Sequence, residues 1–114
     1  MKITIDKELF QWEKGRYVFI ELLQGEAATF VQFYNSKTLE SYNEPLVNGR
    51  SKIPNSLLKN YSPIMAVVCS GTPEQHTVIA RREFRVIKRA KPENYTEDEE
   101  DNIIHVIYDG GEEI

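Results

Sequence analysis

The sequence predicts an all-β protein, a small antiparallel β-sandwich followed by an acidic linker and a C-terminal strand. Apolar and polar residues alternate over short segments, helical spacing is hard to find, and turn signals recur about every 8–12 residues. The chain has 114 residues, the usual size of one domain, and 40% of them are hydrophobic, enough for one packed core. A compact barrel is the competing architecture.

Three strands are expected before residue 40, at residues 2–5 (KITI), 17–23 (YVFIELL) and 29–34 (TFVQFY). The second and third are rich in β-branched and aromatic residues, which suit a half-buried strand. Side chains two positions apart share a face of a strand. The side chains expected to face the core are Val18, Ile20, Leu22, Val31 and Phe33.

The middle of the chain is expected to turn rather than to pair. Asn48-Gly49 predicts a hairpin turn, because both residues tolerate a positive φ. The later segment IPNSLL cannot be a central strand, since Pro54 has no N–H to donate. We expect Asn55 to cap a single helical turn that carries Leu57 and Leu58 inward.

Two further strands follow. Residues 64–69 (IMAVVC) are apolar on both faces, which is typical of a central strand covered from both sides. Residues 76–89 form a long alternating segment in which Arg82 falls among the apolar positions. This break in the alternation predicts a β-bulge near Arg81-Arg82.

The composition changes sharply after Pro92. Residues 1–92 contain all 14 Lys and Arg against 9 Asp and Glu, a net charge of +5, whereas the rest of the chain carries the other 9 acidic residues. The predicted organisation is therefore a β-sandwich domain at 1–92, an acidic flexible linker at 93–102, and a C-terminal strand or docking segment at 103–114.

No residue pattern predicts catalysis. His76 and His105 have no partner at the spacing of metal ligands, and Cys69 lies in the most apolar strand, where a thiol is usually inert. We therefore expect no catalytic, cofactor-binding or metal-binding residue, and no enzymatic activity. Signal-peptide and membrane-spanning runs are absent from the sequence, so we expect synthesis in a reducing cytoplasm and no membrane partner.

A basic stripe is the first candidate interaction site. Its members within eleven positions are Arg81, Arg82, Arg85, Lys88, Arg89 and Lys91. The stripe has three interpretations: a nucleic-acid site, a solvent-facing edge that resists aggregation, or a dock for an acidic segment of this chain or of a neighbour. Of these, the nucleic-acid partner is the least expected.

The C-terminal strand is the second candidate. Its apolar members are Ile103, Ile104, Val106, Ile107 and Tyr108. An exposed strand of this kind invites aggregation, so it should pair with its own sheet, with sister chains, or with another protein by strand addition.

Several motifs, taken in order, resemble small structural proteins of tailed bacteriophages and prophages of Gram-positive bacteria. The shared features fall on Gln11–Arg16 (QWEKGR), Ile53–Leu58 (IPNSLL) and Lys91–Tyr95 (KPENY), and the resemblance covers about residues 8–96. It implies an immunoglobulin- or fibronectin-like sandwich in which Trp12 covers one end. On this interpretation FQWEKGR is a corner of the fold and not a site.

The resemblance also implies a function. We expect a non-enzymatic virion protein, acting as a decoration, head-fibre or tail/baseplate adaptor subunit. Its partners would be other phage structural subunits and copies of itself, and it would reside in the virion after synthesis in the host cytoplasm. The alternative is a phage-encoded binding or inhibitory protein that engages a host factor through the stripe from Arg81 to Lys91.

Overall fold

The computed structural model describes residues 1–97 of the chain, and these residues form short β-strands with one brief 3-10 helix. The elements are β1 (Lys2–Ile5), β2 (Leu9–Phe10), β3 (Tyr17–Glu21), β4 (Phe30–Asn35), β5 (Ser41–Pro45), β6 (Arg50–Lys52), η1 (Asn55–Lys59), β7 (Ile64–Gly71), β8 (His76–Phe84) and β9 (Val86–Ile87). No helix in this range is long and apolar enough to cross a membrane.

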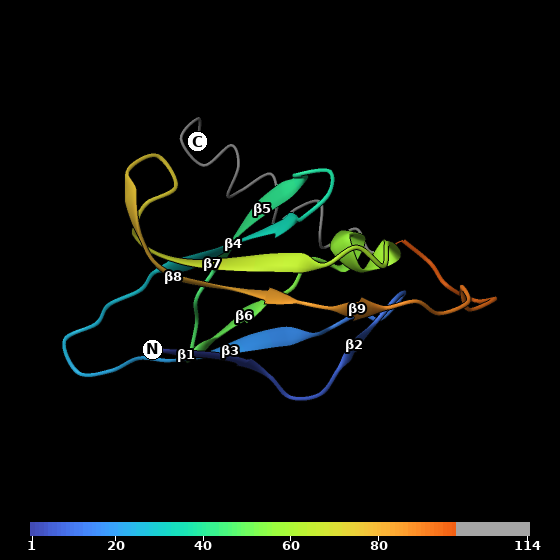
Figure 1. Cartoon of the computed structure of the whole chain (residues 1–114), viewed down its shortest axis with the longest axis horizontal. Helices are drawn as coiled ribbons and strands as arrows, with labels where there is room; N and C mark the ends of the chain where they lie inside the picture. The colour runs from blue at the N-terminus through green and yellow to red at the C-terminus, as the bar shows by residue number, and fades with distance from the viewer. Residues whose placement is uncertain (98–114) are drawn as a thin grey trace.

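Two antiparallel sheets make up the body of the protein (Figure 1). One has the strand order β1-β3-β6 and the other β5-β4-β7-β8. A third, two-stranded pair joins β2 to β9 in parallel, with Leu9 opposite Val86 and Phe10 opposite Ile87. The expected all-β class with antiparallel sheets is confirmed, and the arrangement agrees with a small β-sandwich.

Alternating side chains from both sheets fill the space between them. Val18 and Ile20 of β3 share one buried cluster with Val31 and Phe33 of β4, as expected from their parity. Leu22 was also expected to face the core, but β3 ends at Glu21 and Leu22 is 39% exposed. That expectation is wrong because the alternation of a strand holds only while the chain stays extended.

The helical turn after Pro54 closes one end of the core. Leu57 and Leu58 of η1 are fully buried, as expected. The expected cap is wrong: the N-cap residue is Pro54, and no side chain caps η1. Asn55 is instead the first residue of η1, and its Oδ1 accepts a hydrogen bond of 3.2 Å from the Gly15 backbone N–H.

The Asn48-Gly49 turn carries the chain from one sheet to the other. Its residues have φ values of 55° and 75°, as a hairpin turn of this sequence requires. The strand before it, β5, pairs with β4, whereas β6 after it pairs with β3. The tight turn is confirmed by the bridge between Val47 and Arg50, whose backbones exchange both hydrogen bonds, but β5 and β6 belong to different sheets, so the turn closes one side of the sandwich.

The opposite side is closed by β8. The bulge lies earlier than expected, because the register shifts between Val68 and Cys69, whose partners are Ala80 and Val78, and Ile79 is the extra residue. Arg82 therefore lies on the core-facing side of β8, opposite Ala66, and the bulge does not account for a charged residue there. Its Nη1 donates to the Ile3 carbonyl of β1 at 2.5 Å, so the side chain spans the gap between the two sheets.

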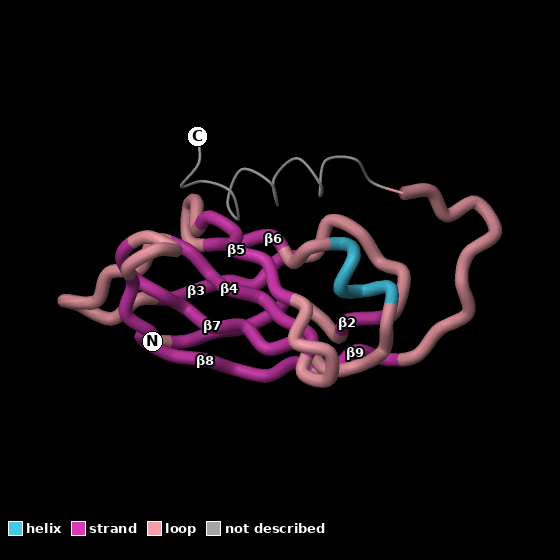
Figure 2. The backbone as a smooth tube through the Cα atoms, turned by 90° about the horizontal axis from the view of Figure 1, so that it is seen from above, coloured by secondary structure: helices cyan, strands magenta, loops and turns pink. Residues whose placement is uncertain are grey.

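Beyond Phe84 the chain leaves β7 and pairs with β2 as β9. As a result η1, β2 and β9 gather at one end of the molecule (Figure 2). Backbone hydrogen bonds confirm this: Gln11 N–H donates to the Ile87 carbonyl at 2.9 Å and Trp12 N–H donates to the Leu58 carbonyl at 2.7 Å.

Candidate interaction surface

The basic stripe divides into three parts. Arg81 and Arg85 are exposed, and among residues 1–97 their side chains make no hydrogen bond, ion pair or ring contact. Arg82 is exposed but engaged, since it donates to Ile3 and its guanidinium lies 5.0 Å from the centre of the Phe84 ring. The cations of the stripe thus face different surroundings, which their spacing in the sequence did not indicate.

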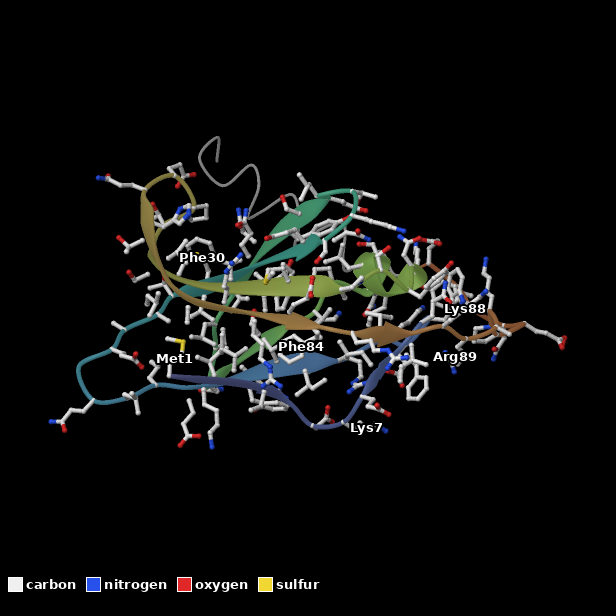
Figure 3. All side chains as sticks on the ribbon, viewed as in Figure 1. Met1, Lys7, Phe30, Phe84, Lys88 and Arg89 are labelled. Atoms are coloured by element: carbon white, nitrogen blue, oxygen red, sulfur yellow. The ribbon has the colours of Figure 1, made fainter. Side chains whose placement is uncertain are left out.

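The third part lies at the end of the molecule where β2 and β9 pair, and Figure 3 shows Lys88 and Arg89 there, far from Phe30. The Arg89 backbone N–H donates to Gln11 Oε1 at 3.1 Å and its Nε donates to the Gln11 carbonyl at 2.8 Å. Lys88 Nζ lies 5.3 Å from the centre of the Tyr61 ring. The Arg89 contacts tie the end of the stripe to the loop after β2, and the Lys88 contact ties it to the segment after η1.

Trp12 is placed in this loop by an unusual backbone conformation. Its φ is 74°, a left-handed value that costs a side chain other than glycine roughly 1–2 kcal/mol. The turn is held by Glu13 N–H donating to the Phe10 carbonyl, and the indole Nε1 donates to the Arg89 carbonyl at 3.1 Å. Trp12 does lie at a turn of the chain, and its ring is directed toward the segment after β9.

Arg16 holds the same loop from inside. Its guanidinium is buried, and it donates to the Glu8 carbonyl at 3.0 Å, the Lys7 carbonyl at 2.6 Å, Asp6 Oδ1 at 2.9 Å and the Glu13 carboxylate. The hydrogen bond from Arg16, opposed by some desolvation, lowers the pKa of the exposed Asp6 carboxyl below its ordinary value. One side chain thereby ties the segment between β1 and β2 to the loop between β2 and β3 that carries Trp12.

Lysines and aromatic rings from distant parts of the chain meet around Trp12. The Trp12 and Tyr95 rings are in edge-to-face contact with centroids 5.2 Å apart. Lys14 Nζ lies 4.6 Å from the Tyr95 ring centre, and Lys91 Nζ lies 5.2 Å from Trp12 and 5.8 Å from Tyr95. We call the whole group the lysine–aromatic end, and its members are Trp12, Lys14, Lys59, Tyr61, Lys88, Arg89, Lys91 and Tyr95.

The acidic segment begins on this surface. Lys14 Nζ donates to the Thr96 carbonyl, and Lys59 Nζ forms an ion pair with the Glu97 carboxylate. The pKa of Glu97 is lowered chiefly by the hydrogen bond from Lys59, which desolvation opposes, and the charges of Lys59, Lys91 and Lys14 lower it further. Residues 95–97 of the expected linker therefore contact the body. The boundaries expected at 92 and 102 remain predictions.

Sequence reasoning missed Lys14, Lys59, Tyr95 and Glu97 as members of one surface. The only available signal was that Trp12 and Tyr95 both lie in motifs of the resemblance. That signal gave no reason to place the two rings together, because they are 83 positions apart and the pairing of β2 with β9, which brings their segments to the same end, is not evident in the sequence.

A second apolar cluster lies on the four-stranded sheet, on the face opposite the main core. Phe30, Val67 and Cys69 are buried there, with Tyr34 and Met65 packed against them. The registers place Val78 beside Cys69 and Arg81 beside Val67 on the same face, and Val78 is 52% exposed. Burial raises the pKa of the Cys69 thiol. We call this surface the outer face.

The remaining candidates from the sequence are the two histidines and the C-terminal strand. His76 lies at the start of β8, and its ring contacts the Phe30 ring edge-to-face at 5.3 Å. Through residue 97, no group of three or more His, Cys, Asp and Glu is positioned to hold a metal ion. Five predicted interaction residues lie outside the described residues, as does His105; the five are Ile103, Ile104, Val106, Ile107 and Tyr108.

Comparison with known proteins adds no relative. No protein-family model, no curated protein and no solved structure matches this chain. The immunoglobulin- or fibronectin-like identity of the sandwich and the phage resemblance therefore remain predictions from the sequence.

Proposed function

We propose that this protein is a non-enzymatic structural subunit of a tailed-phage virion, a decoration, head-fibre or tail/baseplate adaptor protein that acts by protein–protein assembly. The order and spacing of the QWEKGR, IPNSLL and KPENY motifs support the assignment. Its partners are other structural subunits and further copies of itself, and its final location is the virion, after synthesis in the host cytoplasm.

The observation that carries the proposal is that β7 is buried on both faces. Ala66 and Val68 face the main core, whereas Val67 and Cys69 belong to the outer face. Val67 and Cys69 are already covered within the chain, but the solvent face of an antiparallel sheet is commonly polar, so an apolar outer face that continues to an exposed edge favours a further protein layer along that edge. The exposed Val78 extends this apolar surface to β8.

We assign that layer to the apolar segment Ile103–Tyr108 of a neighbouring copy. The segment has the length of a strand and lies 6 residues past Glu97, so the linker spans at most roughly 20 Å when extended. Arg81 lies on the outer face and suits the acidic residues that accompany the segment. Exchange of such segments between identical subunits gives closed oligomers.

Light scattering at several concentrations tests this proposal on the full-length chain. The wild type should form a discrete oligomer, and Val78→Glu or the pair Ile104→Asp and Ile107→Asp should reduce it to monomer. Val47→Glu is the matched control, because Val47 is 55% exposed and belongs to neither apolar cluster. A wild type that stays monomeric at every concentration, or a control that dissociates as readily as Val78→Glu, refutes the assembly model.

A second candidate function is the binding of a host factor through the basic stripe. The observation in its favour is that Arg81 and Arg85 are exposed and unengaged within the described part of the chain. Charge reversal of both to Glu should then abolish capture of one defined host protein, whereas reversal of the exposed Lys37 should not. Equal capture by both variants would exclude a role for the stripe.

A further inference from the structure

We propose that the lysine–aromatic end is a binding site for acidic peptide segments, occupied in the isolated protein by the chain's own sequence from Glu97 to Asp101 (EDEED). The proposal goes beyond assembly through the outer face. It rests on contacts among residues 12–97 and does not depend on the virion assignment.

The first argument is the convergence of ammonium groups. Lys14 and Lys91 both lie within 6 Å of the centre of the Tyr95 ring, at 4.6 Å and 5.8 Å. The negative face of an aromatic ring attracts a cation, but two cations on one ring repel each other. An anion between them relieves that repulsion, so the arrangement favours a negatively charged ligand.

The second argument is that the first acidic residue of the segment is already bound. The Glu97 carboxylate pairs with Lys59, and the charges of Lys91 and Lys14 act on it as well. The next four residues are Asp98, Glu99, Glu100 and Asp101. The segment thus carries five carboxylates in succession, and the surface at which it begins carries five cations, which are Lys14, Lys59, Lys88, Arg89 and Lys91.

The chemistry favours a peptide over a nucleic acid. Sites for single-stranded nucleic acid combine cations with aromatic faces open for base stacking. Here Trp12 and Tyr95 contact each other edge-to-face, Lys91 lies over both rings and Lys88 lies over Tyr61. The rings thereby hold ammonium groups rather than open stacking faces, and the charges of Lys91 and Lys14 act on the Glu97 carboxylate.

Attachment to the same chain makes the segment a strong competitor. A short tether gives an effective concentration in the millimolar range, so an acidic segment of another molecule must displace it. The site should therefore show its full affinity only when the attached segment loses its charge.

A peptide-binding experiment on the full-length chain tests this. The probe is the synthetic peptide TEDEEDN, which is residues 96–102, and the signal is the fluorescence of Trp12, the single tryptophan of the chain. The neutralised variant carries Glu97→Gln, Asp98→Asn, Glu99→Gln, Glu100→Gln and Asp101→Asn. It should bind the peptide about tenfold or more tightly than the wild type does, and binding should weaken as salt is added.

Charge reversals in the neutralised variant locate the site. Lys14→Glu with Lys91→Glu should abolish peptide binding, whereas Lys2→Glu with Lys37→Glu, an equal charge change at exposed positions elsewhere, should preserve it. Equal affinity of the wild type and the neutralised variant overturns the proposal, as does equal loss in both reversal variants. Tighter binding of a single-stranded oligonucleotide of the same charge overturns the assignment to peptides.

Discussion

Replacing Arg16 with alanine is expected to lower the free energy of unfolding by about 1–3 kcal/mol, the cost of leaving hydrogen-bond acceptors at a part-buried site without their donor. Arg16 is 7% exposed and donates hydrogen bonds to two carbonyls and two carboxylates. Its loss leaves the Lys7 and Glu8 carbonyls without this donor, and the part-buried Glu13 carboxylate keeps the hydrogen bond from the Phe10 N–H but loses its ion pair. Asp6 is largely exposed, so water replaces its share of the interaction at little cost.

Two companion measurements separate this explanation from a simple loss of side-chain volume. Arg16→Met keeps most of the apolar stem of the side chain. It should still show most of the loss in unfolding free energy that Arg16→Ala shows. Arg16→Lys keeps the charge but not the planar fork, and should lose about half as much because an ammonium cannot reach all four acceptors. Urea unfolding followed by Trp12 fluorescence measures each variant, since Trp12 lies in the loop that Arg16 holds.

The same interaction gives a pH dependence with a defined sign. The folded-state pKa of Asp6 lies below its ordinary value, chiefly through the hydrogen bond from Arg16. Its contribution to stability is therefore complete above the ordinary pKa of an aspartate and is lost as pH falls through the folded-state pKa. Arg16→Ala should bring the Asp6 pKa, followed by carboxyl NMR, back toward the ordinary value. A loss below about 1 kcal/mol in Arg16→Ala, or an unchanged Asp6 pKa, would refute the reasoning.

Three further outcomes are expected. Gly71→Ala should lower the free energy of unfolding by about 1–3 kcal/mol, because φ is 96° and the new Cβ would lie 2.5 Å from the Gln75 carbonyl oxygen. Gly25 has a similar φ of 89° but no atom within 4 Å of the new Cβ, so Gly25→Ala should lower it clearly less in the same urea titration. Trp12→Gly should be more stable than Trp12→Ala by about 1 kcal/mol, measured by circular dichroism, since both lose the ring but only glycine tolerates the φ of 74°. Cys69 is fully buried with a raised pKa, so a thiol reagent should label it only in denaturant, and fast labelling of the native protein would contradict its placement.

Local patterns were sufficient for most of the strands. The β4 segment alternates and places Val31 and Phe33 in the core, and Asn48-Gly49 makes the turn that its backbone preferences predict. These features depend on neighbouring residues, so short windows of sequence determine them. The errors lie where a distant group decides the outcome: Asn55 bonds to Gly15 and not to its own helical turn, and Arg82 reaches across to Ile3.

The candidate site was less predictable than the fold. The separation of basic residues from the acidic C-terminal part and the alternation within the strands are evident from the sequence, because both depend on residues that are near one another along the chain. The convergence of Lys14, Lys59 and Lys91 near Glu97 and the division of the basic stripe among three surroundings follow only from the folded structure. The physical reason is that the interaction of two charges depends on their separation in space, and that separation is set by how β2, η1 and β9 pack together at one end of the sandwich.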